Sequence, residues 1–319
     1  MAPAGRPTRL LCIVPISTTR MTADLRRAYG SSSPSSSPGL EISFLDGRGL
    51  ADCPPCIENA AQAEQSTRAM LPRVVAHVAA REPPDGVLVC CFSDHPLVHA
   101  LRELFSAGAD TDTGTGTGTG TVGFGLGVVP FVTGIFHAAL REATKTGGRF
   151  GIVTTSRAWG PPLTASVADL GFGAASAGVA PTGLGPLELE SLERRVVVDR
   201  IVACARPLVD DGATSIVLGC AGMTALEEDI LRALPPGVRT VDGVRAGIDL
   251  VCLATRRRSR RRGDEDGHVG DESGSTITDQ RCEDEERMRH PKHRGTRDTA
   301  SSSSADRTTL LPTCLVYDC

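Results

Sequence analysis

The sequence predicts an α/β fold built from two similar units with parallel sheets. Two hydrophobic runs, at residues 86–91 and 215–220, have strand length, end in a cysteine and are followed by a loop and a helix start. The segments between them also alternate between strand and helix patterns. Hydrophobic residues make up 40% of the chain and aromatic residues only 3%. A core of Ala, Val, Leu and Ile suits parallel strands that helices cover on both faces.

The first unit is expected to alternate strands with helices. Strands are predicted at residues 10–16, 40–45 and 87–91, and helices at residues 21–29, 57–80 and 96–105. The Ser- and Pro-rich stretch at residues 30–39 is predicted to be a solvated loop. Residues 107–122 are dominated by Thr-Gly repeats and are predicted to form a flexible, low-complexity insertion.

The second unit is predicted to cover residues 123–234. Its expected helices lie at residues 133–144, 157–170, 187–209 and 225–234, and its expected strands at residues 149–154, 174–179 and 215–220. A short strand at residues 238–242 and a helix at residues 244–254 follow. From Arg256 the composition changes to charge runs and serine, so residues 256–319 are expected to be a disordered, charged tail.

Charge and termini exclude several classes of partner. A net charge of -4 gives no general affinity for polyanions, and the scarcity of aromatic residues argues against base stacking, so no nucleic-acid partner is expected. The amino-terminal residues lead into an apolar strand of about seven residues, too short for a signal-peptide core or a membrane span. We therefore expect a cytoplasmic protein with no membrane partner.

The two strand-end cysteines, Cys91 and Cys220, suit a particular chemistry. They stand at the carboxyl ends of their predicted strands, where open α/β sheets place ligands. Inverting a carbon next to a carbonyl group removes a proton from one face and returns one to the other. Two thiols on opposite walls of a cleft can do this, one as thiolate base and the other as thiol acid. A helix start after each strand is expected to lower the thiol pKa toward neutrality. The alternative is that both are inert buried cysteines.

The other metal- and cofactor-binding patterns are weak. Eleven cysteines in a reducing compartment predict free thiols rather than a disulfide framework. Cys53 and Cys56 have redox or metal spacing, but no second Cys-x-x-Cys or His pair accompanies them. The glycines at residues 123–127 lack the third glycine of a dinucleotide loop. We therefore expect no metal and no cofactor.

Over roughly residues 9–254 the chain resembles the hydantoin racemases of the Asp/Glu/hydantoin racemase superfamily, including allantoin-racemase-like fungal members. The segments that carry the resemblance are Cys91-Phe-Ser-Asp-His-Pro-Leu97, Phe131-Val-Thr-Gly-Ile135, Phe150-Gly-Ile-Val-Thr-Thr155 and Leu218-Gly-Cys-Ala-Gly-Met-Thr224. Aspartate and glutamate racemases typically carry Gly-Cys-Thr-Glu at the second cysteine, so Gly219-Cys-Ala favours the hydantoin branch.

The resemblance implies two pseudo-twofold related Rossmann-like domains with parallel sheets and an active site in the cleft between them. Residues 9–106 with about 235–255 would form one domain, and residues 123–234 the other. Cys91 and Cys220 would be the acid/base pair of a cofactor-independent racemase acting at C5 of a hydantoin ring, either allantoin, the preferred substrate, or a 5-substituted hydantoin. Cys90, one strand position earlier, is expected to point the opposite way.

The chain departs from the family pattern at two places. The family's Asn-Pro-Asn loop is replaced by Val14-Pro-Ile16, and His137 stands where many members have glutamate. Backbone amides after the two cysteines could hold an enolate oxygen or a ring carbonyl. The expected substrate shell is Pro15, Ser17, Thr18, Phe92, Ser93, Asp94, Thr133, Ala221, Gly222, Met223 and Thr224.

Three alternative functions remain open at this point. The same scaffold could serve a related amino-acid racemase, a maleate-type isomerase or an arylmalonate-type decarboxylase. The missing asparagines would also suit a catalytically silent protein that binds a small molecule. Cys53 and Cys56 could instead belong to a thiol redox or metal protein. The sequence leaves open whether the chain forms a homo-oligomer.

Overall fold

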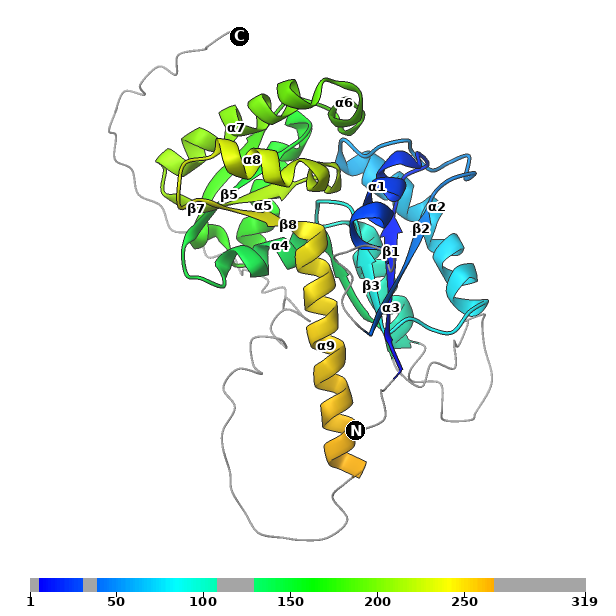
Figure 1. Ribbon diagram of the computed structural model, residues 1–319. Helices are drawn as coiled ribbons and strands as arrows, with labels where there is room; N and C mark the ends of the chain where they lie inside the picture. Colours follow the sequence, from blue (N-terminus) through cyan, green and yellow to red (C-terminus); the bar gives the residue numbers. More distant parts are fainter. Residues whose placement is uncertain (1–5, 31–38, 108–128, 267–319) are drawn as a thin grey trace, which may run out of the picture. The chain divides into compact units, whose positions relative to one another are not determined.

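The chain forms two four-stranded sheets, each with parallel strands, and the two sheets have the same strand order (Figure 1). This computed structural model describes residues 6–30, 39–107 and 129–266, and the side chains of that last range only as far as Arg258. The predicted loop at residues 31–38, nearly all of the Thr-Gly insertion and the tail beyond Asp266 lie outside the described residues.

The first sheet has the order β2-β1-β3-β4, and all of its strand pairs are parallel. Its strands are β1 (Thr8–Val14), β2 (Leu40–Asp46), β3 (Gly86–Val89) and β4 (Phe131–Gly134). The helices that connect them are α1 (Arg20–Tyr29), α2 (Ala60–Ala79) and α3 (Pro96–Ala107). The last five residues of β1 and all of β3 are buried, as expected of central parallel strands.

The second sheet repeats this plan in the order β6-β5-β7-β8, again with parallel pairs. Its strands are β5 (Arg149–Thr154), β6 (Ser176–Pro181), β7 (Ala213–Gly219) and β8 (Arg239–Asp242). Its helices are α4 (Ile135–Thr144), α5 (Gly160–Asp169), α6 (Pro186–Ser191), α7 (Arg194–Asp210), α8 (Glu227–Ala233) and α9 (Gly243–Asp266), with 3-10 turns η2 (Arg157–Trp159), η3 (Gly173–Ala175) and η4 (Ala221–Leu226).

Two strands belong to a different sheet from the one expected. β4 lies within the predicted second unit but pairs with β3, and β8 follows that unit but pairs with β7. Each sheet therefore takes four strands that are consecutive along the chain. The sequence analysis missed β4 because this strand leads directly into α4 at Ile135, and its last residues were included in the helix predicted at residues 133–144.

Two helices also differ from expectation. α9 continues through the basic run at residues 256–262 and ends at Asp266, so the expected onset of disorder at Arg256 is wrong. Arginine is a good helix former, and the run extends a helix that is already anchored by packing. The single helix predicted at residues 187–209 is two helices, because Leu192 adopts an extended backbone between α6 and α7. Among the described residues no helix is both long and apolar enough to cross a membrane.

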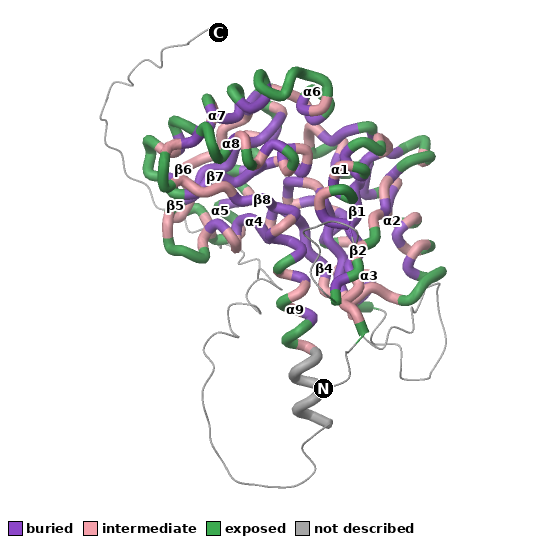
Figure 2. The backbone as a smooth tube through the Cα atoms, viewed as in Figure 1, coloured by how far each residue is buried: buried purple, intermediate pink, exposed green. Residues whose placement is uncertain are grey.

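The central strands of both sheets share a buried core, whereas the outer faces of the helices are exposed (Figure 2). One apolar cluster contains Leu10 and Leu88 from the first sheet together with Phe150 and Val217 from the second. α9 packs closely on β3, because a Cβ atom on Gly247 would lie 2.4 Å from Leu88 Cδ1. The two sheets are thus joined through a common apolar interior.

A buried hydrogen bond also links the two halves of the fold. The Tyr29 hydroxyl on α1 donates to Asp242 Oδ2 at the end of β8, at 2.9 Å. The other carboxylate oxygen, Oδ1, accepts from the backbone N–H of Val244 at 2.6 Å and of Arg245 at 3.2 Å. Asp242 therefore caps the start of α9 while it holds α1.

Candidate active site

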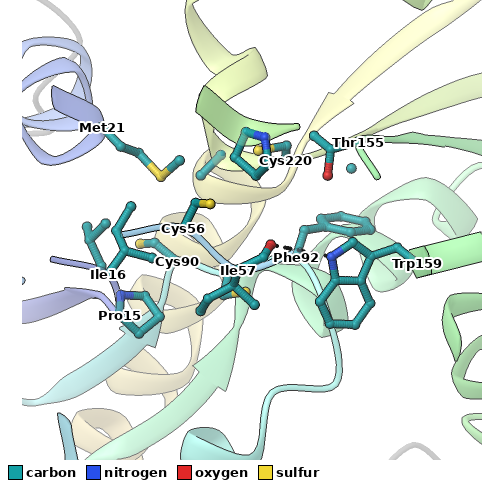
Figure 3. Close-up of a pocket in the computed structure, with 15 residues that line it drawn as sticks. Pro15, Ile16, Met21, Cys56, Ile57, Cys90, Phe92, Thr155, Trp159 and Cys220 are labelled. Atoms are coloured by element: carbon teal, nitrogen blue, oxygen red, sulfur yellow. Dashed lines mark hydrogen bonds between the residues drawn. The ribbon is translucent and has the colours of Figure 1, made fainter. Parts of the chain in front are cut away.

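A narrow cavity of about 40 Å³ lies where the carboxyl ends of four central strands meet (Figure 3). In each sheet the first and third strands in sequence order form the central pair, and the chain leaves them in opposite directions along the sheet. Open α/β sheets bind ligands at this kind of position. The lining residues are Val14, Pro15, Ile16, Met21, Cys56, Ile57, Cys90, Cys91, Phe92, Thr155, Trp159, Pro186, Gly219, Cys220 and Ala221.

Cys91 and Cys220 occupy equivalent places on the two sides of this cavity. Cys91 follows β3, the third strand of the order β2-β1-β3-β4, and Cys220 follows β7, the third strand of the order β6-β5-β7-β8. Both side chains line the cavity. The repeated strand order therefore brings the two thiols to one site from opposite sheets.

Each of the two thiols has one polar partner two residues further along the chain. Cys91 Sγ lies 3.7 Å from Ser93 Oγ, and Cys220 Sγ accepts a hydrogen bond from the backbone N–H of Gly222 at 3.4 Å. Both contacts favour the thiolate and oppose a rise of the pKa. The loop after each strand therefore supplies one polar group that stabilises the thiolate form of its cysteine.

Burial nevertheless raises the pKa of Cys91 to about 12 and that of Cys220 to about 11. The expected lowering toward neutrality is therefore wrong. Burial is the main cause of the raised pKa values, and the expected helix starts do little to oppose it, because α3 begins only at Pro96 and Cys220 precedes the 3-10 turn η4 rather than an α-helix. A helix dipole acts within its first turn, so neither thiol receives much of it. The charge of Cys220 further raises the pKa of Cys91, so the two thiols resist ionising together.

Cys90 also borders the cavity, although it was expected to point away from the side that Cys91 faces. β3 ends at Val89, so the strict alternation of a strand does not extend to these two residues. The Cys90 thiol donates to the carbonyl oxygen of Leu88 at 3.8 Å, and a hydrogen bond with buried Cys12 raises its pKa well above the usual value. Its proton is therefore held within the core.

Cys53 and Cys56 do not form a redox or metal pair in this structure. The Cys53 thiol donates to Pro15 O at 3.8 Å, whereas the Cys56 thiol donates to Glu58 Oε1 at 3.5 Å. Burial raises the pKa of both to about 11, which opposes thiolate chemistry. All the cysteines in the described part of the chain are free, and Cys56 is a lining residue of the cavity that the sequence did not reveal.

The structure brings only part of the expected substrate shell to the cavity. Pro15, Phe92 and Ala221 line it. The Thr18 hydroxyl instead donates to Pro55 O at 2.8 Å, and the backbone N–H of Ser17 donates to Pro54 O. These two residues therefore hold the loop at residues 53–56.

The remaining members of the expected shell have other surroundings. Ser93 and Asp94 line a second cavity of about 260 Å³ beside α2 and α5. The Thr133 hydroxyl is buried and donates to Gly134 O at 3.4 Å. The backbone N–H of Gly222 donates to Cys220 Sγ, and Met223 lies in the apolar core. Thr224 Oγ1 is buried without a hydrogen-bond partner among the described residues.

Trp159 and Ile57 form a wall of the cavity that sequence patterns did not identify. Trp159 Nε1 donates to the carbonyl oxygen of Ile57 at 3.4 Å, which fixes the indole against the cavity (Figure 3). Trp159 is the single tryptophan of the chain and follows β5 closely, a position that could have marked it as a candidate. Val14 and Ile16, which replace the two asparagines of the family's Asn-Pro-Asn loop, line the same cavity and give it apolar surface.

Three side chains outside the first cavity could together hold a metal ion. Asp94, His99 and His137 each offer one ligand atom, and these atoms lie within 4.8 Å of one another.

Comparisons with known proteins identify the family of this chain. The sequence model of the family described as Asp/Glu/Hydantoin racemase matches residues 10–108 and 128–251. An uncharacterized protein of Schizosaccharomyces pombe is 31% identical over 257 residues, which is 78% of this chain and 92% of that protein. The hydantoin racemase of Rhizobium meliloti is 30% identical over 203 residues, which is 62% of this chain and 71% of that protein. The crystal structure of allantoin racemase from Pseudomonas fluorescens superimposes with a TM-score of 0.61 at 25% identity, covering 78% of this chain and 91% of that one.

Proposed function

Because this chain belongs to the Asp/Glu/hydantoin racemase family and is an isomerase of the racemase type, we propose that it inverts C5 of a hydantoin-type ring without a cofactor. Cys91 and Cys220 would transfer the proton. The observation that carries this proposal is their equivalent placement at the ends of β3 and β7, on opposite sides of one cavity. A reaction that exchanges the two faces of a carbon needs such a pair.

The proposed reaction has two proton transfers. One cysteine, as thiolate, takes the C5 proton, and the electron pair left on C5 delocalises onto the neighbouring ring carbonyl oxygen. The other cysteine, as thiol, gives its proton to the opposite face of C5. The roles of Cys91 and Cys220 are then exchanged, ready for the opposite enantiomer. The mutual electrostatic repulsion of two thiolates disfavours the doubly ionised pair, so one cysteine keeps its proton while the other acts as base.

The lining of the cavity favours an apolar substituent at C5 over the polar ureido group of allantoin. Val14, Ile16 and Met21 supply only apolar surface, and the Trp159 N–H is already bound to Ile57 O. A ureido group left without hydrogen-bond partners there would lose about 1–3 kcal/mol. We therefore expect 5-alkyl hydantoins to be better substrates than allantoin. The narrow cavity must widen to admit the ring, so the walls are expected to separate on binding.

The test measures exchange and binding separately. Purified protein is incubated in heavy water with enantiopure 5-isopropylhydantoin or allantoin, and C5 deuteration and optical purity are followed by NMR and chiral separation. Cys91→Ser and Cys220→Ser remove one thiol each, and Cys252→Ser on α9 is the matched control because Cys252 lies outside the cavity. Fluorescence of the single tryptophan, Trp159, reports ring binding.

Exchange with loss of optical purity, abolished by either cavity variant and retained in Cys252→Ser, is the expected result. A change in Trp159 fluorescence without exchange would instead indicate a catalytically silent binding protein. If the protein neither binds these rings nor exchanges their C5 proton, the proposed substrate class is refuted, and an isomerase or decarboxylase reaction is favoured.

A further inference from the structure

A carboxylate and two imidazoles converge beside the loop that carries Cys91. Asp94 lies on this loop, His99 on α3 and His137 on α4. Asp94 Oδ1 is 2.6 Å from His99 Nε2 and 3.2 Å from His137 Nε2. The two imidazole rings meet nearly edge to face, with centroids 6.3 Å apart. Three separate elements thus direct one ligand atom each to a common point.

The chemistry and spacing of these atoms suit a divalent transition metal. Two imidazole nitrogens and one carboxylate oxygen form a ligand set that zinc uses when a fourth position is left to water. The ligand atoms of a tetrahedral zinc ion lie about 3.3 Å apart, given bonds of about 2.0–2.1 Å. The Asp94–His137 contact already has this spacing, and the Asp94–His99 contact must lengthen by less than about 1 Å.

The burial of the three side chains also supports a metal site. The side chain of His137 is 11% exposed, that of Asp94 33% and that of His99 50%, so the cluster is anchored on one side and open to solvent on the other. His137 Nδ1 is buried with no hydrogen-bond partner among the described residues, which leaves Nε2 as its interacting atom.

We propose that Asp94, His99 and His137 bind one Zn²⁺ ion, with water at the remaining position. The ion would join the loop after β3 to α3 and α4, and so would steady the backbone three residues from Cys91. It would not touch the cavity that holds the two thiols, because none of its three ligands lines that cavity. The competing interpretation is a carboxylate that only accepts hydrogen bonds from two imidazoles.

Cobalt titration of the full-length, tag-free protein separates these interpretations. Co²⁺ replaces Zn²⁺ in such sites and its visible absorption reports the ligands. His99→Ala is the main variant because His99 is half-exposed, so its removal leaves the core packing in place. Asp94→Asn keeps the size of the side chain, and His77→Ala, on α2 outside the cluster, is the matched control.

We expect one Co²⁺ per chain, with the visible bands of nitrogen and oxygen ligands and without the intense sulfur-to-cobalt band of a thiolate site. Zn²⁺ should displace the cobalt. His99→Ala and Asp94→Asn should each weaken binding about tenfold or more, while His77→Ala should leave it unchanged. Absence of binding by the unaltered protein, a thiolate spectrum, or equal affinity in His99→Ala would each overturn the proposal.

Discussion

The raised thiol pKa values predict that exchange at C5 increases with pH across the whole neutral range. A thiol with a pKa of about 11, as for Cys220, is thiolate in about one molecule in ten thousand at pH 7. An unperturbed thiol, with a pKa of about 8.5, would be ionised about three hundred times more often at that pH. Because the proposed base is a thiolate, and burial disfavours this charged form, kcat/KM should rise about tenfold for each pH unit from 7 to about 10.

The assay follows C5 exchange of 5-isopropylhydantoin at low substrate concentration from pH 6.5 to 10.5. The rate with Cys220→Ser is subtracted at each pH, because hydroxide also removes the C5 proton and this background rises in the same direction. Alkylation rates of the Cys91 and Cys220 peptides, measured by mass spectrometry over the same range, report the two thiols without any substrate.

A plateau of kcat/KM below about pH 8 would refute the reasoning, because it would show a catalytic thiol with a pKa near neutrality. Burial would then not be the dominant influence on that thiol. Rapid alkylation of Cys91 or Cys220 at pH 7, at the rate of an exposed thiolate, would lead to the same conclusion independently of the substrate chosen.

Three further changes test other parts of the structure. In Gly219→Ala the new Cβ would lie 2.6 Å from a backbone oxygen of β5, so the strand end that carries Cys220 must shift. We expect loss of most exchange activity and about 1–3 kcal/mol of stability in urea unfolding, and wild-type activity would contradict this. Tyr29→Phe removes the hydrogen bond to Asp242 and should lower the free energy of unfolding by about 1.5–3 kcal/mol without affecting exchange. An unchanged urea midpoint would show that this hydrogen bond contributes little to stability. The double change Val14→Asn and Ile16→Asn should raise the kcat/KM ratio of allantoin to 5-isopropylhydantoin at least about tenfold. An unchanged ratio would mean that these walls do not select the substituent.

The sequence predicted every described strand except β4. β1, β5 and β7 each contain a run of consecutive apolar residues, and their observed bounds lie within two residues of the predicted ones. A buried parallel strand leaves this signal because both of its faces are covered. β4 was missed because it runs directly into α4 and overlaps the helix predicted at residues 133–144, and its pairing with β3 depends on distant sequence. Its assignment to a sheet could come only from the fold.

The candidate site shows the same limit. The two strand-end cysteines were identified from their strands and from the family resemblance, whereas Cys56 and Trp159 reach the cavity through loops whose paths the sequence does not reveal. The direction of the thiol pKa shifts was also predicted wrongly, because it depends on burial by distant segments. Asp94 was assigned to the substrate, and only the structure places it against His99 and His137.

The repeated strand order explains why the site is symmetric in its thiols but not in its walls. The ends of β3 and β7 carry Cys91 and Cys220, and a racemase needs these two groups to be equivalent because each must act as base for one enantiomer. The equivalent ends of β1 and β5 differ: Val14 and Ile16 are apolar, whereas Thr155 brings a hydroxyl. A hydantoin ring is itself unsymmetrical, with carbonyl groups on the ring and a substituent at C5. For the proposed hydantoin substrate we therefore expect a single orientation, in which the substituent faces the first sheet and a ring carbonyl faces Thr155. In this orientation C5 would present its two faces to the two thiols without turning the ring around.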